Sequence, residues 1–198
     1  AIDTIYRIRI SSIEPTTIDK AIILMMNTEP KLCRHLHIPL QSGSDEVLAL
    51  MARKYNMDAF RSFVQWVYET VPDVCIGTDV IVGFPGESNA LFDETVANLM
   101  TMPIHYMHVF SYSERKFARS KRREDKVSSD EIARRSRVLR DLSARKRDAF
   151  DSRFKGNTLD VLVETKKKGL WSGLTDNYIR VLFEDIRDLE NKITSVEY

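Results

Sequence analysis

Cysteine is scarce in this sequence. The 198 residues include two cysteines, Cys33 and Cys75, which stand far apart and form no CxxC pair. So few cysteines exclude a disulfide framework, and their spacing excludes a zinc site of the CxxC kind. A chain without disulfides is typical of a reducing compartment, so we expect a cytoplasmic protein.

Long apolar runs are also missing. No stretch approaches the roughly 20 apolar residues that a membrane-spanning helix needs, and no signal peptide opens the chain. Hydrophobic residues make up 43% of the chain and charged residues 30%, which is ordinary for a soluble protein. The first residue is alanine and a strand pattern begins soon after it, so we expect a piece of a longer protein. Its length allows one core plus a small second domain.

Net charge is nearly absent overall but is distributed unevenly. The chain carries +1 in total, with −5 in residues 1–113, +8 in residues 114–155 and −2 in residues 156–198. A basic segment between two acidic ones predicts a surface that faces a polyanion. A solvated helix with i,i+4 ion pairs is the alternative. The segment comprises a charged loop from Phe117 to Lys126 and a long helix after Ser128 or Ser129.

That long helix has one narrow apolar stripe. The stripe consists of Ile132, Leu139, Leu142, Ala149 and Phe150. Arginines occupy much of the remaining circumference, which we expect to be a basic surface: Arg134, Arg135, Arg140, Arg145 and Arg147.

The clearest local pattern runs from Ile76 to Glu87. The β-branched run Val80–Val82 predicts a strand buried on both faces. The turn Gly83–Gly86 ends it, and its glycines allow the backbone to approach a ligand closely. Ser88 then caps a helix. This is a βα unit whose turn presents backbone amides to a small molecule, or a tight turn without a ligand.

The same order of strand, polar loop and helix recurs along the chain. Strands are predicted at 6–10, 35–40, 76–82 and 104–110, with helices at about 18–26, 45–51, 57–71, 88–102 and 128–153. Polar loops follow the strands at 11–15, 41–45, 83–87 and 111–115. The alternation predicts an α/β fold with a parallel sheet, and sites in such sheets gather at the carboxyl ends of the strands. Four units are too few to close an eight-unit barrel, so we expect a partial (βα) barrel.

Two histidines alternate on the strand at 35–40. His35 and His37 therefore share one face. An HxH pair can bind a metal ion, but no third ligand is evident nearby in the sequence. Buried, hydrogen-bonded histidines are the alternative.

After Gly156 the pattern changes to short β runs. They lie at 159–164, 170–172, 178–182 and 193–196, separated by polar turns. This predicts a small antiparallel, OB-like β domain. We place the domains at 1–153 and 154–198.

Four motifs together carry a resemblance to a known family. RISSIEP (9–15), HLHIPLQSGSD (35–45), GTDVIVGFPGE (77–87) and HVFSYS (108–113) resemble the radical SAM methylthiotransferases in order and spacing. The segment GLTDNYIRV (173–181) resembles that family's TRAM domain. The tail is most similar to the branch that methylthiolates N6-threonylcarbamoyladenosine in tRNA.

The resemblance implies an enzyme of three parts. An N-terminal domain would bind one [4Fe–4S] cluster, a partial barrel would bind a second cluster and S-adenosylmethionine, and the TRAM domain would hold tRNA. A 5′-deoxyadenosyl radical would abstract hydrogen from C2 of the adenine, where the methylthio group is installed.

Strand-end placement and the resemblance together assign residues to the cofactor. Gly83, Phe84, Pro85 and Gly86 would meet the adenine and ribose of S-adenosylmethionine, and Val109 and Phe110 would offer strand-edge groups to the same adenine. Gln41, Ser42 and Ser44 would bond the ribose or the carboxylate, with which Arg53 would pair. Ser12 and Glu14 face the same mouth. Each of these residues has the alternative role of stabilising a turn or, for Arg53, of forming a surface ion pair.

The tail residues are assigned to RNA. The predicted contacts are Lys166, Lys167, Lys168, Trp171, Asn177 and Tyr178. The lysines would neutralise phosphates, and Trp171 and Tyr178 would stack on an unpaired base or form the core of the small domain.

The sequence also departs from the family. It has no CxxxCxxC motif, and Lys116-Phe117-Ala118 stands where the family usually has Pro-Gly-Thr. Without three thiolates the radical cluster cannot be held, so no cluster and no catalytic residue are expected in this chain. We therefore expect the C-terminal half of such an enzyme, inactive without its N-terminal half. The alternatives are a non-catalytic nucleic-acid-binding protein on a βα scaffold and a methylthiotransferase for a ribosomal protein.

Overall fold

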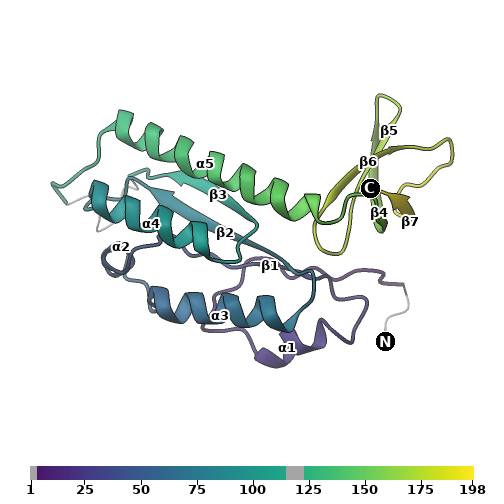
Figure 1. Cartoon of the computed structure of the whole chain (residues 1–198), viewed down its shortest axis with the longest axis horizontal. Helices are drawn as coiled ribbons and strands as arrows, with labels where there is room; N and C mark the ends of the chain where they lie inside the picture. The colour runs from purple at the N-terminus through teal and green to yellow at the C-terminus, as the bar shows by residue number, and fades with distance from the viewer. Residues whose placement is uncertain (1–3, 115–122) are drawn as a thin grey trace.

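Two β-sheets organise the chain, for which a computed structural model describes residues 4–114 and 123–198. The first sheet is parallel, in the order β1 (His35–His37), β2 (Cys75–Val82) and β3 (Tyr106–Ser111). The second is antiparallel, in the order β6-β5-β4-β7, with β4 at Thr158–Lys167, β5 at Leu170–Leu174, β6 at Arg180–Glu184 and β7 at Ile193–Glu197. Figure 1 shows the second sheet at one end of the molecule, beyond the amino ends of the parallel strands. The predicted α/β class, with parallel strands followed by a small antiparallel β unit, is confirmed.

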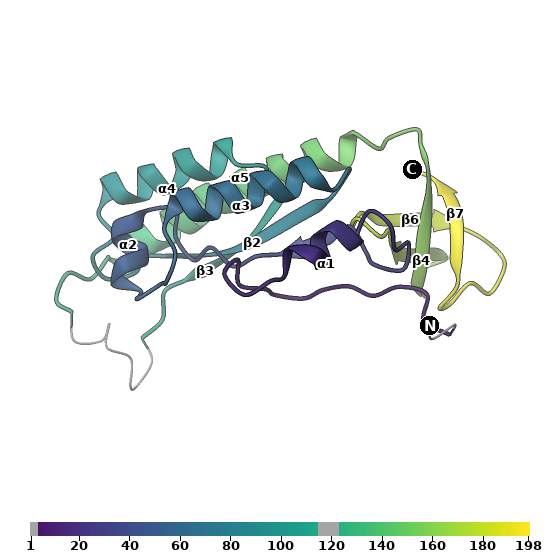
Figure 2. The same cartoon turned by 90° about the horizontal axis from the view of Figure 1, so that it is seen from below.

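Five helices connect and cover the strands. They are α1 (Lys20–Met25), α2 (Asp45–Leu50), α3 (Met57–Thr70), α4 (Asn89–Thr101) and α5 (Ser129–Ser152). Helices α3, α4 and α5 lie on one side of the parallel sheet, whereas the N-terminal segment runs on the other side (Figure 2). In the described part of the chain, no helix combines the length and the apolar character that crossing a bilayer requires.

Local capping sets the start of two of these helices. The Ser88 side chain accepts a hydrogen bond from the N–H of Leu91 at the start of α4, and Ser128 accepts one from Glu131 at the start of α5. Such caps satisfy amide groups that have no partner within the helix. Both starts agree with the sequence prediction.

Alternation along the parallel strands separates the core from the opposite face. Leu36, Ile76 and Val80 point toward the helices and are fully buried. They belong to a large apolar cluster with residues such as Phe60 and Leu99. Neighbouring positions on the same strands, such as His35, His37 and Asp79, point to the other face, which is polar.

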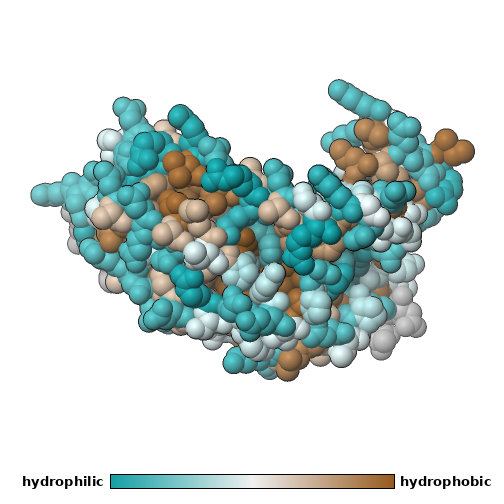
Figure 3. All heavy atoms as spheres, in the orientation of Figure 1, coloured by the Kyte–Doolittle hydropathy of each residue, from teal (hydrophilic) through white to brown (hydrophobic). Residues whose placement is uncertain are grey.

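A second apolar cluster joins the two sheets. Cys75 and Tyr106 from the parallel sheet pack with Phe150 of α5 and with Val161 and Val181 of the antiparallel sheet. The small β unit is therefore docked on the amino ends of β2 and β3 through buried side chains. Figure 3 shows it projecting from the main body with a hollow between the two on the side of α5.

Two sequence predictions are wrong. Residues 6–10 do not form a strand, because their pairing is limited to one isolated bridge between Ile8 and Leu32. Arg135 does not contribute to the basic surface of α5, because its side chain is buried. Part of the charged loop predicted at 117–126, and the Lys116-Phe117-Ala118 departure, lie outside the described residues.

Candidate functional site

The loops after the three parallel strands meet at one edge of the sheet. After β1, Gln41 forms a parallel bridge with Val80: its N–H donates to the carbonyl of Asp79 (2.8 Å) and its carbonyl accepts from Ile81 (2.8 Å). Gly83–Gly86 follows β2 directly, next to a cavity of about 170 Å³ that touches Gly83 and Pro85. The predicted gathering of the polar loops at the carboxyl ends of β1 and β2 is therefore present in the fold.

A buried ion pair holds the Gly83–Gly86 loop in place. Glu87 Oε2 accepts from the N–H of Gly83 (2.6 Å) and from Arg135 Nη1 (2.8 Å), which also donates to the Glu87 carbonyl (2.7 Å). The two side chains are 1% and 3% exposed. Burial raises the pKa of Glu87, against the opposing effect of its hydrogen bonds from Gly83 and Arg135. Sequence reasoning missed Arg135, since helical periodicity does not indicate which arginine meets a distant carboxylate.

Arg135 is fully occupied by partners. Its Nε donates to Glu131 Oε1 one turn earlier (2.8 Å), and its Nη2 donates to Asn89 Oδ1 at the start of α4 (2.9 Å). The guanidinium thus links the first turns of α4 and α5 to the loop after β2.

The two serines after β1 are buried and belong to the turn. Ser42 Oγ lies 3.4 Å from Thr95 Oγ1 and accepts from the N–H of Ser44 (3.3 Å). Gly43 between them packs against the backbone of Thr95, where a Cβ would come within 2.8 Å of the Thr95 Cα. Ser44 Oγ is buried without a hydrogen-bond partner among the described residues. Ser42 therefore stabilises the turn, whereas the Ser44 hydroxyl is a buried group without such a role.

Arg53, Glu14 and Ser12 lie at the mouth near the end of β1. Arg53 Nη1 approaches Glu14 Oε1 at 3.6 Å, a long ion pair between partly exposed side chains, and Ser12 is exposed. Arg53 Nε is buried and, within the described part of the chain, has no hydrogen-bond partner. The Glu14 contact is the ion pair considered as the alternative role of Arg53, and the pairing of Arg53 with a ligand carboxylate stays a prediction.

Val109 and Phe110 lie on β3 at the edge of the sheet. The N–H and C=O of Met107 both bond Ser143 Oγ of α5 (2.7 and 3.1 Å), away from β2. Peptide groups alternate in direction along a strand, so those of Val109 face the same edge. The Phe110 side chain is half exposed, whereas Phe84 is buried edge-on against Tyr112 (ring centroids 5.3 Å apart).

The opposite face of the parallel sheet carries a polar cluster. Tyr106 OH lies 2.9 Å from His35 Nε2 and 3.2 Å from His37 Nδ1. Asp79 Oδ1 lies 2.9 Å from His37 Nε2 and 3.3 Å from His108 Nδ1. Burial lowers the pKa of His35 to about 3 and raises that of Tyr106, so both are neutral at pH 7. The HxH pair is thus hydrogen-bonded, and Asp79 and His108 are neighbours that the local sequence could not indicate.

The small β unit covers the amino end of this face. The Tyr178 ring stacks on His35 with centroids 4.2 Å apart, and Arg147 donates to the Tyr178 carbonyl. Tyr178 is therefore held by the main body. Asn177 is buried, with its amide directed to the Asp73 carbonyl (3.3 Å) and the Thr175 hydroxyl (2.6 Å).

Trp171 is 5% exposed and packs with Val163 and Leu189. That position corresponds to the core role considered for it, not to base stacking. By contrast, Lys166, Lys167 and Lys168 are all exposed at the turn between β4 and β5. Lys166 Nζ donates to the Asp185 carbonyl (2.8 Å) and lies over the Trp171 ring.

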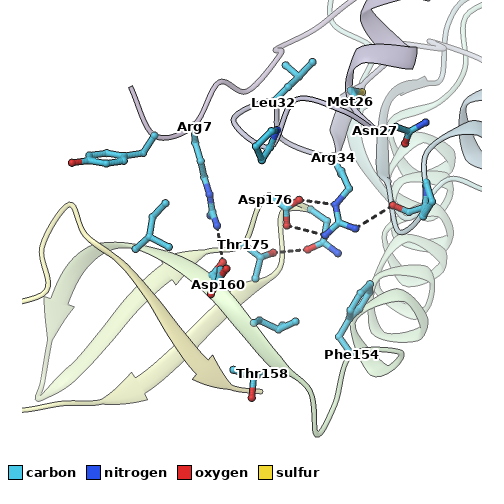
Figure 4. A pocket seen from close by; sticks show the side chains of 16 residues that line it. Arg7, Met26, Asn27, Leu32, Arg34, Phe154, Thr158, Asp160, Thr175 and Asp176 are labelled. Atoms are coloured by element: carbon cyan, nitrogen blue, oxygen red, sulfur yellow. Dashed lines mark hydrogen bonds and ion pairs between the residues drawn. The ribbon is translucent and has the colours of Figure 1, made fainter. Parts of the chain in front are cut away.

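A cavity of about 620 Å³ lies between the N-terminal segment and the small β unit. Figure 4 shows Arg7 and Arg34 reaching into it toward Asp160 and Asp176. Arg7 donates to the carbonyls of Leu174 (2.6 Å) and Asp160 (2.7 Å), and Arg34 Nε pairs with Asp176 Oδ2 (2.6 Å). These contacts connect the two parts of the chain, and the sequence analysis did not find them.

The cysteines do not fit an iron–sulfur cluster. Both are buried free thiols, and burial raises the pKa of Cys75 to about 12 and that of Cys33 above its usual value. Neither belongs to a group of three metal-ligating side chains in the described ranges 4–114 and 123–198. S-adenosylmethionine does fit the strand-end residues, since Ser44 and Arg53 hold unpartnered polar atoms there.

Comparisons with known proteins give one consistent result. The sequence profile of the Radical SAM superfamily matches residues 2–99. Threonylcarbamoyladenosine tRNA methylthiotransferases MtaB from Aquifex aeolicus (strain VF5) and Bacillus subtilis (strain 168) are 37% and 36% identical over 95% and 99% of this chain. A tRNA-2-methylthio-N(6)-dimethylallyladenosine synthase from Endomicrobium trichonymphae is 35% identical over 99% of it. The chain spans 45%, 45% and 47% of these relatives, less than half of their length.

A solved structure has a similar fold. Coproporphyrinogen III oxidase (HemN) from Escherichia coli, described as a radical SAM enzyme, superposes with a TM-score of 0.52 at 18% identity. The match covers 74% of this chain and 32% of that one, and at this identity it supports the fold alone. The profile match and the relatives confirm the resemblance of this chain to the radical SAM methylthiotransferases.

Proposed function

We propose that this chain is the C-terminal part of a radical SAM enzyme that methylthiolates C2 of a hypermodified adenosine in tRNA. The supporting observation is the convergence of the Gln41–Ser44 and Gly83–Gly86 loops at one edge of a parallel sheet. The relatives named above as tRNA methylthiotransferases align over nearly the whole chain. We propose threonylcarbamoyladenosine as the substrate nucleoside, and we keep residues 1–153 and 154–198 as the two domains.

S-adenosylmethionine would bind at the strand-end edge. When bound and reduced by a cluster, it supplies the 5′-deoxyadenosyl radical. Gly83–Gly86 brings backbone to its adenine and ribose, and the edge peptide groups of Val109 face the same side. Gln41 and Ser44 would bond the ribose or the carboxylate, and the Arg53 guanidinium would pair with the carboxylate. The cluster ligands would come from the additional length that the relatives have.

This chain should bind S-adenosylmethionine weakly by itself. Its thiols cannot hold the cluster, whose iron would chelate the amine and the carboxylate of the methionine moiety. The contacts left to this chain are those of its own residues with the adenine and the ribose, and that of Arg53 with the carboxylate. We expect calorimetry to find no binding tighter than about 10 μM, or about −7 kcal/mol. Saturation-transfer NMR at millimolar ligand should mark adenine and ribose protons more strongly than the methionine methyl group.

Arg53→Ala should weaken this binding, whereas Arg180→Ala, a change at an exposed side chain on β6 of the small β unit, should not. Nanomolar binding by the unmodified chain would contradict the proposal of an incomplete site.

The tRNA would lie along α5 and the β4–β5 turn. Residues 114–155 carry a net charge of +8, and the turn adds Lys166, Lys167 and Lys168. A hollow separates the projecting β unit from the main body on the side of α5 (Figure 3). Phosphates bound there would release counterions, so affinity should fall steeply as salt increases.

Replacing Lys166, Lys167 and Lys168 together by alanine should weaken tRNA binding. The slope of log K against log salt should decrease by roughly 2, less than one unit per lysine because not all three need contact phosphate. Lys166 in particular is already engaged by the Asp185 carbonyl. Filter binding from low to moderate salt measures both quantities.

A triple variant of Lys20, Lys31 and Lys54 is the matched control, since it removes the same charge from the first 54 residues. Equal slopes for the lysine-turn variant and the unmodified chain would remove this turn from the RNA site. Binding without salt dependence would contradict the tRNA assignment itself.

A further inference from the structure

We propose that His37, Asp79 and His108 form a binding site for a divalent transition-metal ion. Within residues 4–114 and 123–198, these three side chains are the one group of at least three histidine, cysteine or carboxylate ligands close enough to share an ion. The site lies on the face of the parallel sheet opposite the helices, and neither the iron–sulfur chemistry nor the tRNA contacts proposed above use it.

Three adjacent strands supply one ligand each. Asp79 and His108 are directly paired across β2 and β3, and His37 on β1 pairs with Gly77, two residues before Asp79. Alternation along the strands places all three side chains on the same face. The sheet register therefore creates the cluster from residues that are 29 to 71 positions apart in the sequence.

The ligand atoms are at suitable separations. Asp79 Oδ1 lies 2.9 Å from His37 Nε2 and 3.3 Å from His108 Nδ1, and all three ligand atoms lie within 4.8 Å of one another. Metal bonds of about 2.1 Å in tetrahedral geometry place neighbouring ligand atoms about 3.4 Å apart. To bring the ligand atoms to these separations, the His108 ring would have to rotate. Its side chain is 54% exposed, which leaves it room to do so.

A neighbouring hydroxyl supports His37 as a ligand. Tyr106 OH lies 3.2 Å from His37 Nδ1, on the ring nitrogen away from Asp79. If Nδ1 donates its proton to Tyr106, the Nε2 lone pair is directed toward Asp79 and the ion. Metal-binding histidines usually have such a partner on their second nitrogen, which fixes the tautomer and the ring orientation.

The donor set selects the class of metal. Two imidazoles and one carboxylate suit Zn²⁺, Co²⁺, Ni²⁺ or Fe²⁺, whereas Mg²⁺ and Ca²⁺ prefer oxygen ligands throughout. Three protein ligands leave at least one coordination position for water or an oxygen of a bound molecule. The exposed His108 ring provides a path for the ion from solvent.

Metal titration of the tag-free chain tests the site. After treatment with EDTA and desalting, we expect calorimetry to detect one saturable Zn²⁺ per chain, and we expect Co²⁺ to give a visible absorption band. His108→Ala and Asp79→Asn should each weaken Zn²⁺ binding at least about tenfold and abolish the Co²⁺ band, since each removes one of three ligands. Circular dichroism identifies any variant that fails to fold, and the exposure of His108 makes its variant the least disruptive.

His105→Asn is the matched control. His105 Nδ1 accepts from the N–H of Ile76 (2.9 Å), and its ring packs on Phe150, away from the cluster. This variant should retain both the Zn²⁺ affinity and the Co²⁺ band. Absence of saturable Zn²⁺ binding, binding that survives His108→Ala and Asp79→Asn, or equal weakening by His105→Asn in a folded protein would overturn the proposal.

Discussion

Replacing Arg135 by alanine is expected to lower the free energy of unfolding by about 3–5 kcal/mol. The change would leave Glu87 buried without its cation, and Glu87 already has one oxygen, Oε1, without a hydrogen-bond partner in the described structure. It would also remove the links to Glu131 and Asn89. Urea unfolding followed by circular dichroism measures the difference.

Arg134 is the matched control on the same helix. Its side chain is 50% exposed and pairs with the same Glu131. Because exposed ion pairs contribute little, Arg134→Ala should cost less than about 1 kcal/mol. Similar losses for the two variants would contradict the buried ion pair, whereas the double change Arg135→Met with Glu87→Leu should cost less than Arg135→Ala alone because no charge stays buried.

Gly83→Ala is expected to cost about 2–5 kcal/mol, because it combines two penalties. The backbone of Gly83 has φ +78°, a left-handed conformation that strains an L-residue. A Cβ there would also lie 2.7 Å from Ile132 Cδ1 and still closer to Cγ1. The strain would act on the loop assigned to the cofactor. Chemical denaturation measures the loss.

Gly169→Ala separates the two penalties. Gly169 has φ +88°, but no atom lies within 4 Å of a Cβ at that position. We expect it to lose about 1–2 kcal/mol from the backbone conformation alone. If Gly83→Ala lowers the free energy of unfolding no more than Gly169→Ala does, the packing of Ile132 against the Gly83–Gly86 loop does not constrain that loop.

Local signals in the sequence were sufficient to predict most of the helices and strands. Ser88 and Ser128 mark the starts of α4 and α5 because a capping hydroxyl bonds amides only three residues away. The alternation of strands and helices indicated the parallel sheet, and the short β runs after Gly156 indicated the antiparallel one. The strand predicted at 6–10 is wrong because alternation shows that a segment can pair, not how far the pairing extends: Ile8 bridges Leu32, and the ladder goes no further.

Surface and core were harder to distinguish for single side chains. Arg134 and Arg135 are neighbours with the same chemistry, yet one is exposed and the other is buried against Glu87. Trp171 was open to two roles, and its position with Val163 and Leu189 corresponds to the core. Burial depends on which distant element packs over a side chain, and periodicity in one helix or strand does not contain that information.

The sequence by itself determined the family motifs, the helix caps and the placement of the polar loops at strand ends, because each depends on residues close together in the chain. The tertiary structure decided which of those residues meet. It brought Arg135 to Glu87, Tyr178 to His35, and Asp79 and His108 to His37. The physical reason is that sheet register and helix docking set distances between residues far apart in sequence, and an ion pair or a metal site depends on those distances.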